Sequence, residues 1–165
     1  MSSDLLEAFR HSAWANRQVL DSLRALTAEQ LATNLPTGHG PPLVTMKHLI
    51  GAESYYLSLI RGSSLGWDWD EAREETPDEL LVFVEALAEA WAAVLSASFD
   101  SGRMLETRST RVKVGVMLAQ ALHHANVHRE QICACLTALG IQLPDVQPWA
   151  YADETGRGRW LGANG

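Results

Sequence analysis

The stretch ALHHANVHREQI, residues 121–132, decides the fold, because its hydrophobic spacing continues in both directions as one long helix. We expect that helix to run from about Lys113 to Leu139. At 3.6 residues per turn, His124 and His128 lie on one arc of its surface, together with regularly spaced apolar positions. Those positions are Val114, Met117, Ala121, Ala125, Ile132, Cys135 and Leu139. The two histidines are therefore predicted to face the interior.

An inward pair of histidines one helical turn apart needs partners. Burying a polar group without a hydrogen bond or a ligand costs about 1 to 3 kcal/mol. A metal ion would be such a partner, because histidines at positions i and i+4 can chelate one. The alternative is that each ring is an ordinary core histidine with hydrogen-bonded neighbours. His123, Glu130 and Cys133 fall off the arc, so we expect them on the solvent side or the flank of the helix.

Three more amphipathic segments predict helices earlier in the chain, over about 4–25, 44–61 and 77–99. Thr76 and Glu79 form a capping box before the third of them, and Gly140 ends the last helix. No segment shows the sustained alternation of a strand. We therefore predict an all-α four-helix bundle with long crossover connections. It forms a single domain over residues 1–165, with an irregular C-terminal tail from about 148 to 165.

Composition narrows the class of protein. The chain has 165 residues, of which 47% are hydrophobic and 20% charged, with a formal net charge of −7. No apolar run is long enough to span a membrane, and no basic stripe offers a surface for nucleic acid. We expect a cytoplasmic protein with no membrane and no nucleic-acid partner. The two cysteines, Cys133 and Cys135, point apart on one helix and are expected to be reduced.

The second predicted helix adds a third inward histidine, His48, within VTMKHLIGAESYYLSLI. Its arc also holds Val44, Ala52, Tyr55, Tyr56 and Leu59. Three neutral imidazoles, from His48, His124 and His128, would leave a metal ion at least one open position, as catalytic sites do. Imidazole suits zinc, nickel and iron, and the sequence does not choose among them. The metal would ionise a bound water near pH 7 or hold a thiol as its thiolate.

The remaining candidates are expected to be ordinary surface or core residues without a part in the site. His11 and His39 are expected at the surface, as is His123. Glu53 lies on the flank of its helix, where a solvated carboxylate is favoured over a general base. Tyr55 is expected to pack in the core rather than to line a pocket.

Two features stay open between structural and functional roles. Asn16, in the inward stripe of the first helix, is either a satisfied buried amide or a polar group near a site. Trp67 and Trp69, on either side of Asp68, either anchor their connection to the domain or cover the mouth of a pocket.

These residues carry a resemblance to a known family. AWANRQVL in the first helix, His48 in the second, and His124 and His128 followed by Arg129 and Gln131 resemble the DinB-like (DinB/YfiT) superfamily of metalloproteins over about residues 4–157. The resemblance implies a bundle of unusual connection order, a divalent metal held by the three histidines, and homodimers. Glu130 departs from the family pattern, which commonly has glycine there, and puts in doubt a close contact that glycine would permit.

The resemblance also bears on activity. It implies a metal-dependent enzyme that acts on a small molecule, with a low-molecular-weight thiol as cofactor in some relatives, which are transferases or isomerases. A metal-hydroxide hydrolase is equally allowed by the residues. The alternative from another class is a non-catalytic metal- or ligand-binding bundle linked to stress responses. A solvent-connected cavity beside the three histidines would favour the enzyme, and a sealed site the structural role.

Overall fold

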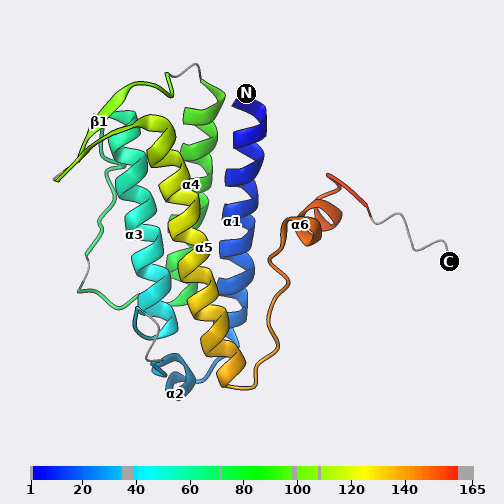
Figure 1. Ribbon diagram of the computed structural model, residues 1–165. Coiled ribbons are helices and arrows are strands. Elements are labelled where there is room, and N and C mark those ends of the chain that lie inside the picture. The colour runs from blue at the N-terminus through cyan, green and yellow to red at the C-terminus, as the bar shows by residue number, and fades with distance from the viewer. Residues whose placement is uncertain (1, 35–38, 71, 98–99, 108, 160–165) are drawn as a thin grey trace.

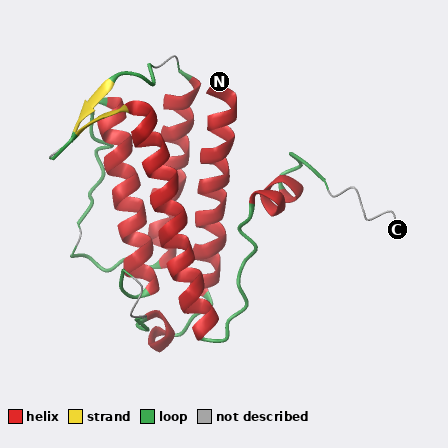
Figure 2. Ribbon diagram, viewed as in Figure 1, coloured by secondary structure: helices red, strands yellow, loops and turns green. Residues whose placement is uncertain are grey.

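Four long helices pack side by side in a computed structural model that describes residues 2–34, 39–70, 72–97, 100–107 and 109–159 (Figures 1 and 2). The long helices are α1 (Ser2–Arg24), α3 (Pro42–Arg61), α4 (Pro77–Ser96) and α5 (Val114–Ala138). Two short helices, α2 (Ala28–Leu31) and α6 (Pro148–Glu154), and an antiparallel hairpin of β1 (Met104–Glu106) and β2 (Arg111–Lys113) complete the described elements. The architecture is the predicted all-α bundle.

The order of the helices in space differs from their order in the chain. α1 packs most extensively against α4, and α3 against α5; α3 also meets α4, and α1 meets α5. The consecutive helices α1 and α3 are therefore diagonal partners. Figure 1 shows α3 and α4 running in the same direction, with the connection between them returning along the length of the bundle. This long crossover, residues 62–76, places α3 beside α5, the two helices that carry the inward histidines.

The helix-capping signals in the sequence act as helix ends in the structure. Thr76 and Glu79 cap α4 reciprocally, and a second capping box joins Thr27 and Gln30 at α2. Gly62 ends α3 in the left-handed region, with a φ of 75° that disfavours a side chain. The predicted end of the third long helix at Phe99 lies outside the described residues, and α4 ends at Ser96.

Two elements contradict the sequence prediction. The hairpin was not expected, because each strand has three residues, too few for alternation to show; Leu105 is nevertheless buried in the core. The tail was predicted to be irregular from 148, yet Pro148–Glu154 forms α6 and buries Tyr151 against Trp14 of α1. The rest of that predicted tail, from 160, lies outside the described residues. Among the residues that are described, no helix is long and apolar enough to cross a membrane.

Four side chains lie where the periodicity did not place them. Val44 and Tyr55, expected in the core, are 51% and 40% exposed. Cys133, expected on the solvent side or flank, is buried. His11, expected at the surface, is half-buried, and its Nε2 lies 2.8 Å from the backbone oxygen of Val146. For His11, the covering contact comes from the segment that follows α5.

Candidate metal centre

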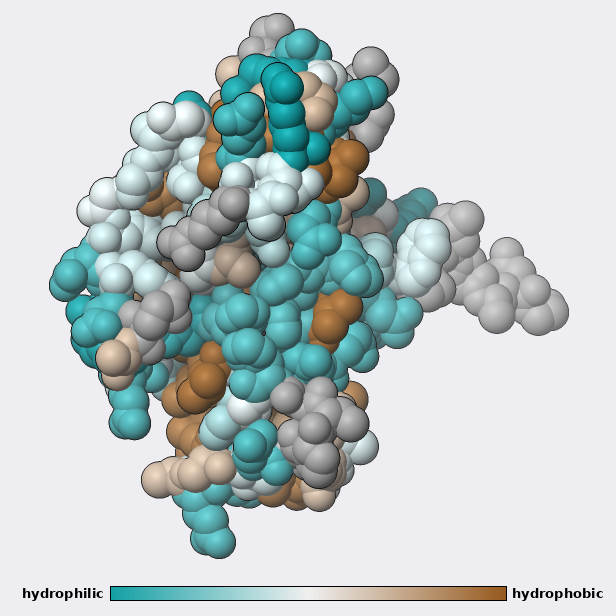
Figure 3. All heavy atoms as spheres, turned by 60° about the vertical axis from the view of Figure 1, so that its left-hand side comes forward, coloured by the Kyte–Doolittle hydropathy of each residue, from teal (hydrophilic) through white to brown (hydrophobic). Residues whose placement is uncertain are grey.

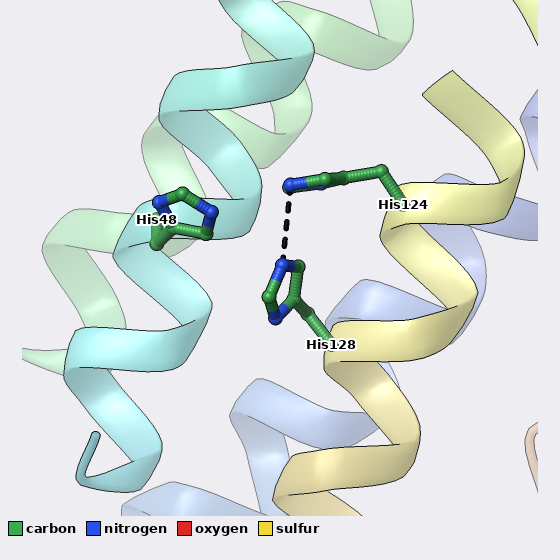
Figure 4. A group of neighbouring side chains, drawn as sticks. All are labelled: His48, His124 and His128. Atoms are coloured by element: carbon green, nitrogen blue, oxygen red, sulfur yellow. Dashed lines mark hydrogen bonds between the residues drawn. The ribbon is translucent and has the colours of Figure 1, made fainter. Parts of the chain in front are cut away.

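Three histidines from two helices converge in the gap between α3 and α5. His48 extends from α3, and His124 and His128 extend from α5, so that the three rings meet across the helix interface (Figure 4). The ring centroids lie 5.1 Å apart for His48 and His124, 4.8 Å for His48 and His128, and 4.3 Å for His124 and His128. The predicted convergence is therefore present in the structure.

The nitrogen atoms of this cluster are spaced as potential ligands. One donor nitrogen from each of His48, His124 and His128 lies within 4.8 Å of the other two, a group that could hold a metal ion. The Nε2 atoms of His124 and His128 are 3.1 Å apart. Bond lengths of about 2.0–2.1 Å imply that two nitrogens of a tetrahedral zinc site lie about 3.3 Å apart. The α5 pair is already close to that spacing, and the donor nitrogen of His48 lies within 4.8 Å of both.

Gln131 orients one of the rings. Its side-chain oxygen lies 2.7 Å from Nδ1 of His128, one turn further along α5. With Nδ1–H donating to this oxygen, Nε2 of His128 keeps its lone pair and points at His124. Histidine ligands commonly donate their second ring N–H to such an acceptor, which fixes the tautomer and raises the basicity of the ligand. Gln131 entered the sequence argument only through the family resemblance, and its orienting role appears only in the structure.

Electrostatics keeps the two α5 histidines in the neutral, ligating form. Burial, followed by repulsion from His128, His48 and His39, lowers the pKa of His124 to about 4. Burial also lowers the pKa of His128, against the opposing effect of its hydrogen bond with Gln131. At neutral pH these imidazoles are therefore uncharged, as metal binding requires.

A buried polar group next to His128 in the chain joins α5 to α1 by hydrogen bonds. Arg129 of α5 is 3% exposed and donates to Oδ1 of Asn16 on α1 at 2.7 Å and to Oγ of Ser12 at 3.1 Å. Glu53 of α3 is also buried; burial raises its pKa to about 7, while Arg129, Trp91 of α4 and Asn16 favour its ionised form. The solvated carboxylate expected at Glu53 is wrong. Asn16 is a satisfied buried amide.

A cavity opens beside the cluster. It has a volume of about 600 Å³; His39 and His48 line one part of it, and Leu31, Leu43 and Leu80 contribute apolar walls. Lys47, next to His48, also lines it, and its Nζ lies 2.7 Å from a carboxylate oxygen of the buried Glu75. Lys47 also donates to the backbone oxygens of Asp70 and Arg73, which fastens the crossover to α3. The cavity wall is thus a fixed part of the fold.

The other candidates separate into near and distant residues. His39, predicted to be an ordinary surface residue, is exposed but stacks on His48, so that prediction is wrong. His123 and Glu130 are exposed as expected. Tyr56, rather than the exposed Tyr55, approaches the site, with its ring centroid 5.8 Å from that of His124.

The tryptophans of the crossover have an anchoring role. Trp67 and Trp69 pack on Phe83 of α4, with ring centroids 5.1 and 5.2 Å away. Neither tryptophan is among the residues that line the cavity. Of the two roles left open by the sequence, the structure supports attachment of the connection to the bundle.

Comparison with known proteins gives two findings. A family model described as the DinB family matches residues 1–159. The crystal structure of a DinB-like protein from Bacillus cereus ATCC 10987 superposes with a TM-score of 0.71, at 18% sequence identity, over 87% of this chain and 95% of that one. No curated protein matches the chain. At this identity the structural likeness supports the fold.

Proposed function

The chain belongs to the DinB family, and from this premise we propose that it is an enzyme dependent on a divalent transition metal held by His48, His124 and His128. The observation that carries the proposal is the convergence of three histidine side chains beside a cavity of about 600 Å³. Three nitrogen ligands leave a coordination position for an exogenous group. A cavity that borders His48 favours catalysis over the non-catalytic binding protein, for which a sealed site was expected.

The reaction we propose is attack by the sulfur of a small thiol on an electrophilic substrate, in which a bond from sulfur to the substrate forms, the thiol loses its proton and the substrate loses its leaving group. Hydrolysis by a metal-bound hydroxide is the alternative. A bound zinc, nickel or iron ion would supply the ionised thiol or water at neutral pH. His128, oriented by Gln131, and His124, kept neutral by burial, would hold that ion. The apolar walls of Leu31, Leu43 and Leu80 would accept the uncharged part of a small-molecule substrate.

The oligomeric state and the cellular location are further proposals. We propose a homodimer in the cytoplasm, on the strength of the family resemblance; sedimentation velocity of the full chain tests the dimer. A role in a stress response belongs to the non-catalytic alternative and has no support from the geometry of the site.

Metal analysis of purified variants tests the site. Wild-type protein should hold about one transition-metal ion per chain, and His124→Ala should lose it, because a chelating ring is removed. His123→Ala is the matched control, since this exposed neighbour points away from the cluster. Metal content unchanged by His124→Ala would refute the site. If the metal is lost as expected, activity with small thiols and electrophiles, compared with ester hydrolysis, distinguishes the two reactions.

A further inference from the structure

A fourth histidine lies against the three-histidine cluster. The ring of His39, in the loop before α3, stacks on that of His48, with centroids 3.7 Å apart and an interplanar angle of 25°. Its centroid is 5.4 Å from that of His128. The three cluster rings are themselves separated by 4.3 to 5.1 Å. His39 is therefore about as near to two of these rings as they are to one another.

The stack places His39 within reach of the ion, but the stack itself is not a ligating geometry. The lone pairs of two nearly parallel imidazoles lie in separate ring planes, so they run side by side and do not converge on one ion. In a tetrahedral zinc site two ligand nitrogens lie about 3.3 Å apart, with both lone pairs directed at the ion. His39 is not part of the set of mutually close nitrogens, so a rotation of its side chain has to precede ligation. It is exposed and lies outside any helix, so the rotation leaves the bundle unchanged.

His39 also faces the route by which a small molecule would arrive. It lines the same cavity as His48, whereas neither His124 nor His128 is among the lining residues. A molecule that enters from the cavity therefore meets His39 and His48 before it meets the α5 pair. A residue that only orients a ligand through a hydrogen bond, as Gln131 orients His128, would not need to line the cavity.

We propose that His39 is a displaceable fourth ligand of the metal held by His48, His124 and His128. This proposal rests on the proposed function and adds to it a preference of the site for thiols over water. With four nitrogen ligands the resting site has no open position and holds no reactive water. An incoming group has to replace a neutral imidazole, which a thiolate does and water does not, because sulfur is the softer and more strongly binding donor.

The exchange is a substitution of one ligand by another. The bond between the metal and His39 breaks, a bond between the metal and the sulfur of the thiol forms, and the proton of the thiol passes to solvent. No change of oxidation state is involved. The site would therefore bind small thiols in preference to hydroxide, which favours the transferase over the hydrolase.

Cobalt(II) is the probe for the fourth ligand, because tetrahedral cobalt absorbs visible light far more strongly than five- or six-coordinate cobalt. The full chain, freed of metal, is titrated with cobalt(II) and with zinc(II). We expect strong absorption in the wild type and in His123→Ala, and weaker, shifted absorption in His39→Ala. Zinc affinity should fall at least about tenfold in His39→Ala, since loss of a supporting residue alone costs 10- to 100-fold. Added 2-mercaptoethanol should bind His39→Ala at lower concentration than wild type.

A cysteine at the same position gives a positive signal. His39→Cys should show a sulfur-to-cobalt charge-transfer band, and His123→Cys, which faces away, should show none. The proposal of a fourth ligand would be overturned if His39→Cys showed no such band and His39→Ala kept the cobalt spectrum and zinc affinity of the wild type. The three-histidine site would then still stand. If His124→Ala also bound cobalt as the wild type does, the proposed function would fail with it.

Discussion

At the scale of single residues, the site depends on polar side chains kept inside the bundle in defined protonation states. His124 and His128 are held neutral by burial, and Arg129 remains surrounded by acceptors on α1 and α5. Glu53 is the exception, because burial raises its pKa to about 7. Its charge therefore changes close to physiological pH, in a position where ionisation is costly.

The titration of Glu53 predicts a pH-dependent stability. The folded carboxyl keeps its proton up to about pH 7, whereas the unfolded one ionises near its ordinary pKa of 4.5. Between these values the folded state binds more protons, so the free energy of unfolding falls as pH rises. Over the whole window the loss is on the order of 3 kcal/mol. Glu53→Gln removes it, so the variant should gain stability relative to wild type between pH 4.5 and pH 8.

Urea unfolding of the metal-free protein at pH 5 and pH 8 measures this difference. The variant Glu89→Gln, at an exposed position on α4, serves as the control and should follow the wild type. A free energy that depends on pH equally in wild type and Glu53→Gln would show that Glu53 does not titrate in this window.

The sequence predicted part of this residue-scale arrangement. An i, i+4 pair on an apolar arc was enough to place His124 and His128 inside, and a similar arc placed His48. His39 was missed because a loop has no periodicity from which its direction can be inferred. Glu53 was missed because α3 is covered on more sides than its own pattern of apolar residues indicates.

At the scale of elements, the crossover between α3 and α4 is attached to the bundle at a glycine. A Cβ at Gly51 of α3 would lie 2.9 Å from Cζ2 of Trp69, whose ring also packs on Phe83. Trp69 and the ion pair of Lys47 with Glu75 are thus two points at which residues 62–76 are fastened. This attachment shapes the cavity wall near His48.

Two glycine substitutions test this attachment with different expected effects. In a helix interior, alanine is more favourable than glycine by about 0.8–1.0 kcal/mol. Gly115→Ala should be close to neutral, because Gly115 lies in the first turn of α5, where this gain is smaller, and the oxygen of Ser101 is 3.5 Å from the added Cβ. At Gly51 the added Cβ forces the tryptophan ring to move, which costs about 1–3 kcal/mol and exceeds that gain. Gly51→Ala should therefore destabilise the protein by up to about 2 kcal/mol. Denaturant unfolding measures both, and a stabilised Gly51→Ala would show that the crossover is loosely attached.

Elements differ in how well the sequence predicted them. The long helices were found within a few residues because four or more turns give a clear period and strong caps, as at Thr76. The hairpin and α6 were missed because elements of three and seven residues contain too little repetition. Their formation depends on contacts with the bundle, such as that of Tyr151 with Trp14.

At the scale of the whole molecule, the crossover topology creates the site. Because α3 and α4 run in the same direction, α3 can lie beside α5 and bring His48 to the α5 pair. The face on the side of α3 is mostly hydrophilic, with apolar surface in separate patches (Figure 3). The resemblance, rather than a physical pattern, predicted this connection order, because long connections permit several arrangements of four helices.

The position of a bound ion is the measurement that tests this account most directly. Crystals of the full chain loaded with zinc, measured on both sides of the zinc absorption edge, locate the metal by its anomalous scattering. We predict one strong peak per chain, about 2.1 Å from Nε2 of His124, Nε2 of His128 and a ring nitrogen of His48. A zinc-loaded crystal with no peak between α3 and α5, or with its peak at other side chains, would contradict it.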